Sequence, residues 1–570
     1  MAKIIYGGDT ETCEGVPFLF QFFSADRGHA RRDLVWINDP SSATERLLYW
    51  CGSLRSDAQH VVYVHNLGFD TISFLWGHKK NLVADSSGEF DFRVGKWRIK
   101  GAYGAPTFFR VSSGKHRSVV FVDSFSWFRA TLAKAADLFC PHLPKLDAPA
   151  DLGTKVFHAS NKAFCSYAMR DAEIAYYMGV SIEQIHQDFD ITQTVSIADT
   201  AARVFRHHFV HDPIPLPDVN VLTASLASYH GGKNNWIGEP GWYRDVTCLD
   251  ISSAYPHAMA EFPSFTVAEA YRSVRITGSR TRSVPDLGVY CVRGELAPCK
   301  WPIFYSHSFK PLPPGVVIDV WVTGFELNEA LSSGEFRLAN ARGYIYDADK
   351  DRSKYRPMAA YVEEFYRRKQ TETDKVKRTF DKLLLNALYG KFIQTRKRNV
   401  RDAVAEDNQL IETAELVAGG LFHPFIATLI TGHTRARIHA IEHKYQAIHT
   451  ATDGIITTKK VNLKEQNGIG SLVVEACGDV VILRNKLYVL YGPSGEMPSS
   501  VFRGKKIIKY AMHGFQGTIY DLERLIASGF RYYSKNRPNT LRESLNRGLV
   551  PNKFEKRAYT LKVGSLEVRR

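Results

Sequence analysis

The length of the chain is the feature that most constrains its fold. A single hydrophobic core usually stops growing at about 250 to 300 residues, so a chain of 570 residues is expected to form at least two domains. The composition is 44% hydrophobic and 23% charged, which excludes the collagenous, coiled-coil and intrinsically disordered classes. We therefore expect a multidomain globular protein.

The net charge of +15, from 74 Lys and Arg against 59 Asp and Glu, favours a polyanionic partner. Much of this charge is concentrated in one stretch, because Arg367–Arg401 holds twelve Lys or Arg and three Asp or Glu. A basic run of this kind is also typical of a solvated helix face. Charge alone therefore does not identify the chemistry.

Cysteine usage and hydropathy predict the compartment. The eight cysteines contain no C-x-x-C pair, so neither a zinc site nor a disulfide framework is indicated. The N-terminus has an acidic residue at position nine and no long apolar core, unlike a signal peptide. The most apolar long window, Leu416–Gly432, is interrupted by His423 and Pro424. We expect a cytoplasmic protein that is neither secreted nor bound to a membrane.

Two acidic clusters follow predicted strands in the first third of the chain. The segment Lys3–Tyr6 leads into Asp9 and Glu11, which would lie on the same side of a strand and could share a cation. The apolar segment Val61–Val64 leads into a turn that ends at Asp70. Taken singly, the first cluster is an ordinary strand end and the second an ordinary helix cap.

A third cluster lies on a predicted helix. Tyr167 and Asp171 are four residues apart and project from one helix face. A tyrosine buried near an aspartate is common in folded proteins. The order D-x-E, N-x-x-F-D and Y-x-x-x-D along one chain is what indicates a shared function.

This ordered set resembles the proofreading 3′→5′ exonuclease of B-family DNA polymerases. The resemblance implies that Asp9, Glu11, Asp70 and Asp171 hold two Mg²⁺ ions and that Tyr167 orients the attacking water. Phosphodiester cleavage requires a metal-activated hydroxide and neutralisation of the leaving oxygen, which Mg²⁺ on hard oxygen ligands supplies. A lysine of the protein-primed members matches Lys145. The family's single-strand contacts match Thr12, His65, Asn66, Phe69 and Ser124, the last within Asp123–Phe128.

The string Leu249–Pro256 resembles the palm motif D-x-x-S-L-Y-P of the same family, with Ala254 in place of leucine. The ordinary alternative is a strand followed by a proline turn. The resemblance implies that Asp250 is a ligand of both polymerase metals, with Ile251 also at the metal. The backbone of Ile251 and Ser252 would cradle the triphosphate. Tyr255 would exclude ribonucleotides by a clash with the 2′-hydroxyl.

The basic run contains a match to the finger-helix pattern K-x-x-x-N-S-x-Y-G, with Ala387 in place of serine. Lys382, Asn386 and Tyr389 are spaced to form one stripe of a helix. The resemblance implies that Lys382 meets the triphosphate and that Tyr389 packs against the nascent base pair, with Lys369 as a further nucleotide contact. The alternative is an amphipathic core helix.

The third palm motif departs from the family. Members carry D-T-D-S, whereas this chain has Ala451-Thr452-Asp453-Gly454. The second aspartate is the direct metal ligand in the family, so Asp453 and Asp250 would still form the carboxylate pair. We expect activity to be retained, with an altered rate or metal preference.

Shorter matches imply contacts with DNA. Tyr229–Gly232 fits the linker motif Y-x-G-G, which has a plain glycine turn as its alternative. The T-x-x-x-R and K-x-Y elements of the family are matched in order along the chain. The implied DNA-binding residues are Tyr229, Gly231, Gly232, Thr431, Arg435, Lys486 and Tyr488.

Motif spacing favours the compact protein-primed subfamily of the phage phi-29 type. Asp250 and Lys382 are 132 positions apart, and Lys382 and Asp453 are 71 apart, which leaves room for two insertions. The resemblance implies an α/β and α+β multidomain fold, with an RNase H-like exonuclease domain before a right-hand polymerase. The expected divisions are 1–190 exonuclease, 191–261 palm, 262–356 first insertion, 357–394 fingers, 395–425 second insertion, 426–515 palm and 516–570 thumb.

The same resemblance implies the cofactors and partners. We expect Mg²⁺, two ions per active site, with Mn²⁺ as an alternative. The partners would be primer-template and single-stranded DNA, dNTPs and a terminal protein that primes synthesis. The protein would be a monomer that replicates a linear viral or plasmid genome in the host cytoplasm, with strand displacement and high processivity.

Two other functions stay open. Ala451 motivates a nucleic-acid-binding scaffold with an impaired polymerase site. An exonuclease that never polymerises is the second, although it leaves Tyr255, Lys382 and Asn386 unexplained.

Overall fold

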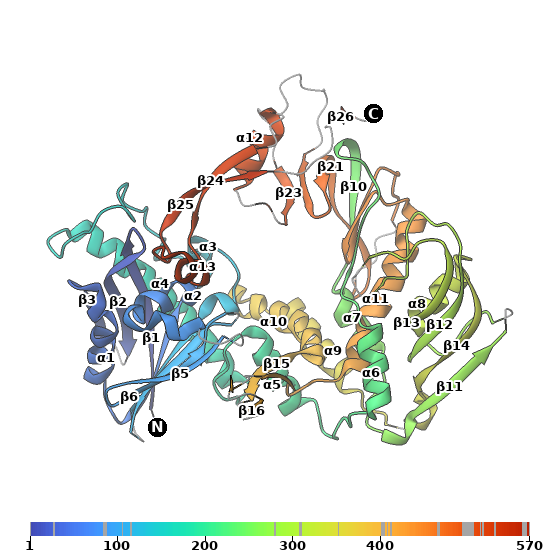
Figure 1. Ribbon diagram of the computed structural model, residues 1–570, viewed down its shortest axis with the longest axis horizontal. Coiled ribbons are helices and arrows are strands. Elements are labelled where there is room, and N and C mark those ends of the chain that lie inside the picture. The colour runs from blue at the N-terminus through green and yellow to red at the C-terminus, as the bar shows by residue number, and fades with distance from the viewer. Residues whose placement is uncertain are drawn as a thin grey trace.

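The computed structural model describes most of the chain, and Figure 1 shows its elements arranged around a ring. The described residues are 2–26, 29–83, 88–104, 106–114, 117–278, 281–306, 310–351, 353–400, 405–406, 409–410, 413–463, 468–492, 507–513, 515, 518–528, 532–560 and 567–568. Separate sheets and hydrophobic cores confirm the expected multidomain fold of mixed helices and strands. Among these residues, no helix is both long and apolar enough to span a membrane.

The N-terminal domain is built on an eight-stranded sheet of order β3-β2-β1-β4-β8-β7-β6-β5. Its central strands β1, β4 and β8 are parallel to one another, whereas the outer pairs are antiparallel. The strands are β1 (Ala2–Cys13), β2 (Val16–Asp26), β3 (His29–Trp36), β4 (Ala58–Val64), β5 (Glu89–Val94), β6 (Trp97–Ala102), β7 (Phe108–Ser113) and β8 (Arg117–Asp123).

Helices cover both faces of this sheet. The alternating side chains of β4 separate the faces: Val62 packs with α1 (Ala43–Ser53) and α2 (Leu67–Phe74), while Tyr63 packs with α4 (Lys162–Asp188). Helix α4 crosses the sheet closely at two glycines. A Cβ on Gly7 would lie 1.9 Å from the carbonyl oxygen of Ala172, and one on Gly179 would lie 2.4 Å from the Tyr63 ring.

The second large sheet contains the segments expected to form the palm and is called the palm below; its strands have the order β23-β22-β21-β10-β20-β19-β9 and are antiparallel. Helices α7 (Ala254–Glu261) and α11 (Pro424–Tyr445) lie beside this sheet. Ile438 and Ile441 of α11 pack on Leu249 of β10. The strands are β9 (Lys233–Trp236), β10 (Gly241–Ile251), β19 (His449–Thr452), β20 (Gly454–Thr457), β21 (Leu472–Arg484), β22 (Leu487–Tyr491) and β23 (Ile507–Met512).

Two further units flank the palm in sequence. A four-stranded sheet of order β11-β14-β12-β13 packs through α8 (Gly324–Ser332) against α11. Its strands are β11 (Tyr271–Thr277), β12 (Gly288–Leu296), β13 (Gly315–Thr323) and β14 (Phe336–Tyr346).

Helices α9 (Pro357–Thr371) and α10 (Lys375–Ala387) form an antiparallel pair, followed by the strand pair β15 (Thr395–Val400) and β18 (Thr413–Ala418). Phe380 of α10 packs on Phe139 of α3 (Leu132–Phe139), which joins this pair to the N-terminal domain.

The C-terminal segment returns to the N-terminal domain and closes the ring (Figure 1). It contains α12 (Ile519–Ser528), β24 (Tyr532–Pro538), α13 (Leu541–Arg547) and β25 (Phe554–Thr560). The side chain of Asn552 donates to the carbonyl oxygen of Phe69 over 3.0 Å, and Lys553 pairs with Glu14 at 2.9 Å. The segment around Asn552 is therefore in direct contact with the N-terminal domain.

A buried ion pair holds β9 against α11. Lys233 pairs with Glu442, both side chains are fully buried, and the Thr450 hydroxyl donates to the second Glu442 oxygen over 2.5 Å. Removing one partner of a buried pair leaves an uncompensated charge, whereas removing both leaves none.

We predict that Lys233→Met lowers the free energy of unfolding of the palm by about 3–5 kcal/mol. The double variant Lys233→Met/Glu442→Leu should recover most of that loss. Denaturant titration followed by tryptophan fluorescence measures both. A single variant as stable as the unsubstituted chain would contradict the prediction.

Candidate active sites

Three elements of the N-terminal domain bring four carboxylates together. Asp9 and Glu11 lie two residues apart on β1, as predicted, and Asp171 lies on α4 above them. Asp70 lies in the first turn of α2 rather than at its cap, and it accepts a hydrogen bond of 2.7 Å from the hydroxyl of Thr10. Glu11, Asp70 and Asp171 are all buried. The close approach of α4 at Gly7 is what allows this convergence.

The carboxylates repel one another strongly. Burial, then Asp70, Asp171 and Glu11, raise the pKa of Asp9 well above its ordinary value. Burial and Asp171 raise the pKa of Glu11 to about 8, and burial raises that of Asp70 to about 7. A group of hard oxygen ligands with this unbalanced negative charge fits divalent cations such as Mg²⁺.

Lys145 is a cation that reaches this pocket, where it opposes the effect of burial by lowering the pKa of Asp9, Glu11 and Asp171. Its ammonium group lies 2.6 and 2.5 Å from the two oxygens of Asp171 and 5.0 Å from the centre of the Tyr167 ring. Tyr167 is buried one helical turn before Asp171, so the structure brings together both residues of the third motif and the predicted lysine.

The loop beside the pocket is held by Asp123, which is not among the predicted site residues. One oxygen of Asp123 accepts hydrogen bonds from the backbone of Asn66, Leu67 and Phe125 at 3.0 to 3.2 Å. These bonds fix Asn66 in a left-handed conformation (φ 71°) and leave its side chain exposed. Thr12 and Phe69, which follow Glu11 and precede Asp70 in the same motifs, are partly exposed.

The predicted DNA contact at Ser124 needs correction. Its side chain is fully buried, and its hydroxyl lies 3.1 Å from Nδ1 of His65. The other His65 nitrogen lies 2.8 Å from the carbonyl oxygen of Ala130. Ser124 therefore positions the partly buried His65 and does not itself face the solvent.

The palm brings Asp250 and Asp453 together at the junction of two strands. Asp250 ends β10 opposite Gly454 of β20, and the backbone N–H of Ile251 donates to the carbonyl oxygen of Asp453 over 2.9 Å. Burial, followed by Asp453, raises the pKa of Asp250 to about 7. This pair forms although Ala451 replaces the other aspartate of the motif.

The backbone N–H groups of Ile251 and Ser252 belong to the predicted phosphate cradle. Both are used inside the palm, since that of Ser252 donates to the carbonyl oxygen of Ser471 over 2.9 Å. The carbonyl group of Ile251 is the part of that residue that stays a candidate for the metal.

Two tyrosines stack beside the palm pair. The rings of Tyr255 and Tyr389 lie 4.0 Å apart at 20°, and burial, Tyr229 and then Asp453 raise the pKa of Tyr389. Gly232 lets the Y-x-G-G loop approach this stack, because a Cβ there would lie 2.9 Å from the Tyr255 hydroxyl. The predicted neighbours of the nascent base pair are thus grouped around one wall of the site.

The finger helix ends earlier than predicted. Lys382 and Asn386 lie on α10, both exposed, but α10 stops at Ala387 and Tyr389 begins a 3₁₀ helix. The single α-helical stripe of three residues was therefore wrong at its third member. The tighter turn directs Tyr389 onto Tyr255.

Lys369 of α9 belongs to the same cationic surface as Lys382. Burial, then Lys382 and Arg378, lower the pKa of Lys369, which shows that three cations crowd together here. By contrast, Arg368 pairs with Asp381 at 2.9 Å and Arg367 with Glu364 at 2.8 Å. Lys369, Lys382 and Arg378 therefore form a positively charged surface that can bind an anion, whereas Arg367 and Arg368 are already paired with carboxylates.

Thr431 and Arg435, which are predicted to contact DNA, have buried side chains in α11. Arg435 pairs with Glu326 of α8 at 2.8 Å and donates to the carbonyl oxygens of His230 and Gly231. Arg435 therefore holds the Y-x-G-G loop in place from behind. Its effect on DNA would be indirect.

Lys486 lies near Asp453, and Tyr488 interacts with Lys509, one of two further charged residues that the motifs did not reveal. Lys486, Lys509 and Glu475 all act on the pKa of Asp453, which burial raises. Lys509 and Glu475 form an ion pair across β23 and β21. No local motif marks them, since only the strand pairing brings them to the site.

The pKa shifts predict how metal binding depends on pH. A carboxyl group whose pKa is raised on folding stabilises the fold below its unfolded pKa and loses that contribution as pH rises through the folded pKa. With Glu11 at about 8 and Asp70 and Asp250 at about 7, the metal-free protein should lose stability between about pH 4 and pH 8. Mg²⁺ should offset this loss.

We therefore predict that Mg²⁺ raises Tm by several degrees more at about pH 8.5 than at about pH 6. Differential scanning fluorimetry in chelator and in millimolar Mg²⁺ measures the difference. Asp9→Asn should be more stable than the unsubstituted chain without metal and should gain less from Mg²⁺. An equal Mg²⁺ effect at both pH values would argue against the carboxylate pocket.

Comparison with known proteins places the chain in a family. Residues 161–456 match the family described as DNA polymerase type B, organellar and viral. A DNA polymerase of Kluyveromyces lactis is 27% identical over 38% of this chain and 22% of its own length, so the chain spans under a quarter of that relative. The DNA-directed DNA polymerase of Enterobacteria phage PRD1 is 22% identical over 83% of this chain and 80% of its own length.

Solved structures show the same fold over nearly the whole chain. Phi29 DNA polymerase complexed with single-stranded DNA has a TM-score of 0.68 at 15% identity and covers 98% of this chain and 100% of that one. Its ternary complex with primer-template DNA and incoming nucleotide has a TM-score of 0.67 at 15% identity, over 99% and 100%. The family match covers more than half of the sequence, and the chain therefore belongs to the type B DNA polymerases of organelles and viruses.

Proposed function

We propose that the chain is a DNA-templated DNA polymerase that extends a primer 3′-hydroxyl and proofreads with a 3′→5′ exonuclease. The polymerase assignment is supported by the close approach of Asp250 and Asp453, where β10 pairs with β20. The exonuclease assignment is supported by the separate pocket of Asp9, Glu11, Asp70 and Asp171.

The residues of the palm and fingers would perform distinct tasks. Lys382, with Lys369 beside it, would bind the triphosphate and Asn386 would face the same surface of α10. Tyr389 would pack against the new base pair. Tyr255, held by this stack, would occupy the space of a ribose 2′-hydroxyl.

The N-terminal pocket would hydrolyse the primer end. Tyr167 would orient a water molecule toward the phosphodiester, and Lys145 would partly neutralise Asp171 until substrate arrives. The single-strand contacts proposed at Thr12, Asn66 and Phe69 lie along the same loop and strand.

Each pocket would hold two Mg²⁺ ions, or Mn²⁺, on its carboxylates. When bound, such ions neutralise the developing negative charge and lower the pKa of a coordinated hydroxyl or water. The mutual repulsion of the carboxylates supports this assignment, because two cations would remove it.

Protein priming, strand displacement and replication of a linear genome are the finer parts of the proposal. They are supported by the fold shared with phi29 DNA polymerase and by the two units between the palm motifs, the sheet β11–β14 and the pair β15–β18. A terminal protein would be the partner that supplies the first hydroxyl.

The two-site proposal predicts opposite phenotypes for two single substitutions. Asp453→Ala should lower primer extension by at least about a thousandfold and leave exonuclease activity unchanged, because only the palm loses a ligand. Asp9→Ala should do the reverse. Gel assays on a labelled primer-template, in Mg²⁺ and separately in Mn²⁺, measure both activities.

Either substitution removing both activities from a folded protein would contradict separate sites. Tight primer-template binding by the unsubstituted chain without extension in either metal would favour the scaffold with an impaired site, which the replacement at Ala451 motivates.

The priming proposal has its own test. Incubation with labelled dNTP and a candidate terminal protein, without any DNA primer, should join label to a serine, threonine or tyrosine of that protein. Asp453→Ala should abolish the labelling. Extension that always requires a nucleic-acid primer would contradict protein priming while leaving the polymerase assignment intact.

A further inference from the structure

We propose that the chain carries a transition-metal site, of the kind that takes Zn²⁺, where the β11–β14 sheet meets helix α11. Its ligands would be Glu335, His439 and His443, one atom of each lying within 4.8 Å of the others. This site is separate from both carboxylate pockets. It would fasten the insertion between the palm motifs to the palm itself.

The distances between the side chains fit a shared ion. Glu335 Oε2 lies 3.0 Å from Nε2 of His439, and Glu335 Oε1 lies 2.5 Å from Nε2 of His443. Ligand atoms about 2.0–2.1 Å from a tetrahedral Zn²⁺ lie about 3.3 Å apart, so small outward shifts would admit the ion. His439 and His443 are four residues apart on α11 and present their rings on one face.

The polar atoms of this cluster are poorly satisfied without a cation. Glu335 is 5% exposed, and its Oε1 and the Nε2 of His443 are buried with no hydrogen-bond partner among the described residues. They face each other without hydrogen-bond geometry. A cation between them would bind both lone pairs.

His439 is held as a metal-binding histidine usually is. Its Nδ1 lies 2.9 Å from a Glu329 oxygen, and its Nε2 lies 2.9 Å from the carbonyl oxygen of Trp301 as well as near Glu335. Both ring nitrogens therefore face oxygen acceptors, which requires either a second proton or a cation at Nε2. A carboxylate on the far nitrogen is the common outer-shell partner of a zinc-bound histidine.

Cys299, which precedes Trp301 by two residues, lies beside Glu335 and makes a side-chain hydrogen bond with it. Zn²⁺ binds cysteine as the thiolate, so Cys299 would complete a four-ligand set with Glu335, His439 and His443. The site has no C-x-x-C signature because its members come from segments far apart in the sequence.

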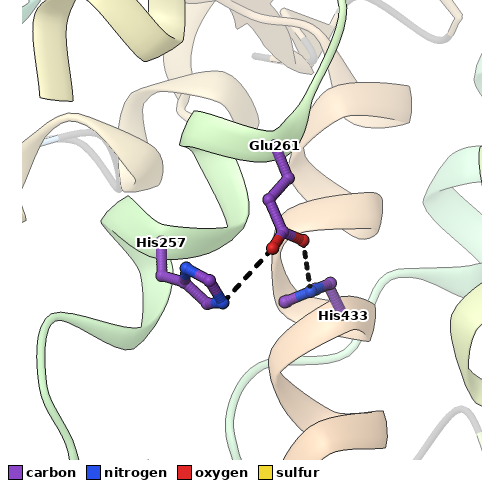
Figure 2. Close-up of side chains that lie close together, drawn as sticks. All are labelled: His257, Glu261 and His433. Atoms are coloured by element: carbon purple, nitrogen blue, oxygen red, sulfur yellow. Dashed lines mark ion pairs between the residues drawn. The ribbon is translucent and has the colours of Figure 1, made fainter. Parts of the chain in front are cut away.

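A second His–Glu–His cluster in the palm serves as a control (Figure 2). There His257 and His433 lie 3.4 and 3.0 Å from Glu261, whose side chain is half exposed. His433 Nδ1 of that cluster is also buried without a hydrogen-bond partner in the described part of the chain, but the Glu261 carboxylate is exposed to solvent and is not left unsatisfied there. We assign the metal to the buried cluster.

Zinc binding by the full chain tests the assignment. Purified protein stripped with chelator is titrated with Zn²⁺ in millimolar Mg²⁺, which occupies the carboxylate pockets, and competition with a chromophoric chelator reports the affinity. We expect one Zn²⁺ per chain and a rise in Tm on binding. His443→Ala and Glu335→Gln should each weaken binding at least tenfold, and Glu329→Gln about 10- to 100-fold.

His257→Ala should bind Zn²⁺ as the unsubstituted chain does. No stoichiometric binding, or a loss of binding in His257→Ala but not in His443→Ala, would overturn the proposal. His443 is partly exposed, so its alanine variant should fold, and circular dichroism of each variant confirms that. The Co²⁺-loaded protein gives an independent readout: tetrahedral d–d absorption that His443→Ala lacks supports the site, and its absence in the unsubstituted chain contradicts it.

Discussion

Repulsion between buried carboxylates is the interaction on which the rest of this structure depends. Asp9, Glu11, Asp70 and Asp171 come from one strand and two helices, and the pKa of each is raised in part by burial. Asp250 and Asp453 repeat the arrangement in the palm. Such clusters cost folding free energy unless cations compensate them, so the surrounding scaffold has to hold them by other contacts.

The scaffold supplies those contacts through close backbone approach and buried ion pairs. Gly7 and Gly179 bring α4 onto the first sheet, and Gly232 brings its loop onto Tyr255. The Arg435–Glu326 and Lys233–Glu442 pairs lock α11 to the insertion and to β9. The positions of Asp250 and Asp453 therefore depend on contacts between segments that are about 100 to 200 residues apart in the sequence.

Local periodicity made part of the site predictable. The two-residue repeat placed Asp9 with Glu11, and the four-residue repeat placed Tyr167 with Asp171, because both follow directly from strand and helix geometry. The family resemblance supplied Asp250 and Asp453. Ser124, Thr431 and Arg435 were assigned to DNA although they are buried, since burial depends on packing between distant segments. Lys509 and Glu475 were missed for the same reason. The end of α10 at Ala387 was not predicted, because the spacing of the motif residues continues through Tyr389.

Anomalous diffraction from crystals soaked in Mn²⁺ would test the central claim most directly. The account predicts peaks between Asp250 and Asp453 and a separate set among Asp9, Glu11, Asp70 and Asp171. Well-ordered crystals with Mn²⁺ in neither pocket, or a pocket whose carboxylates turn away from each other, would contradict it.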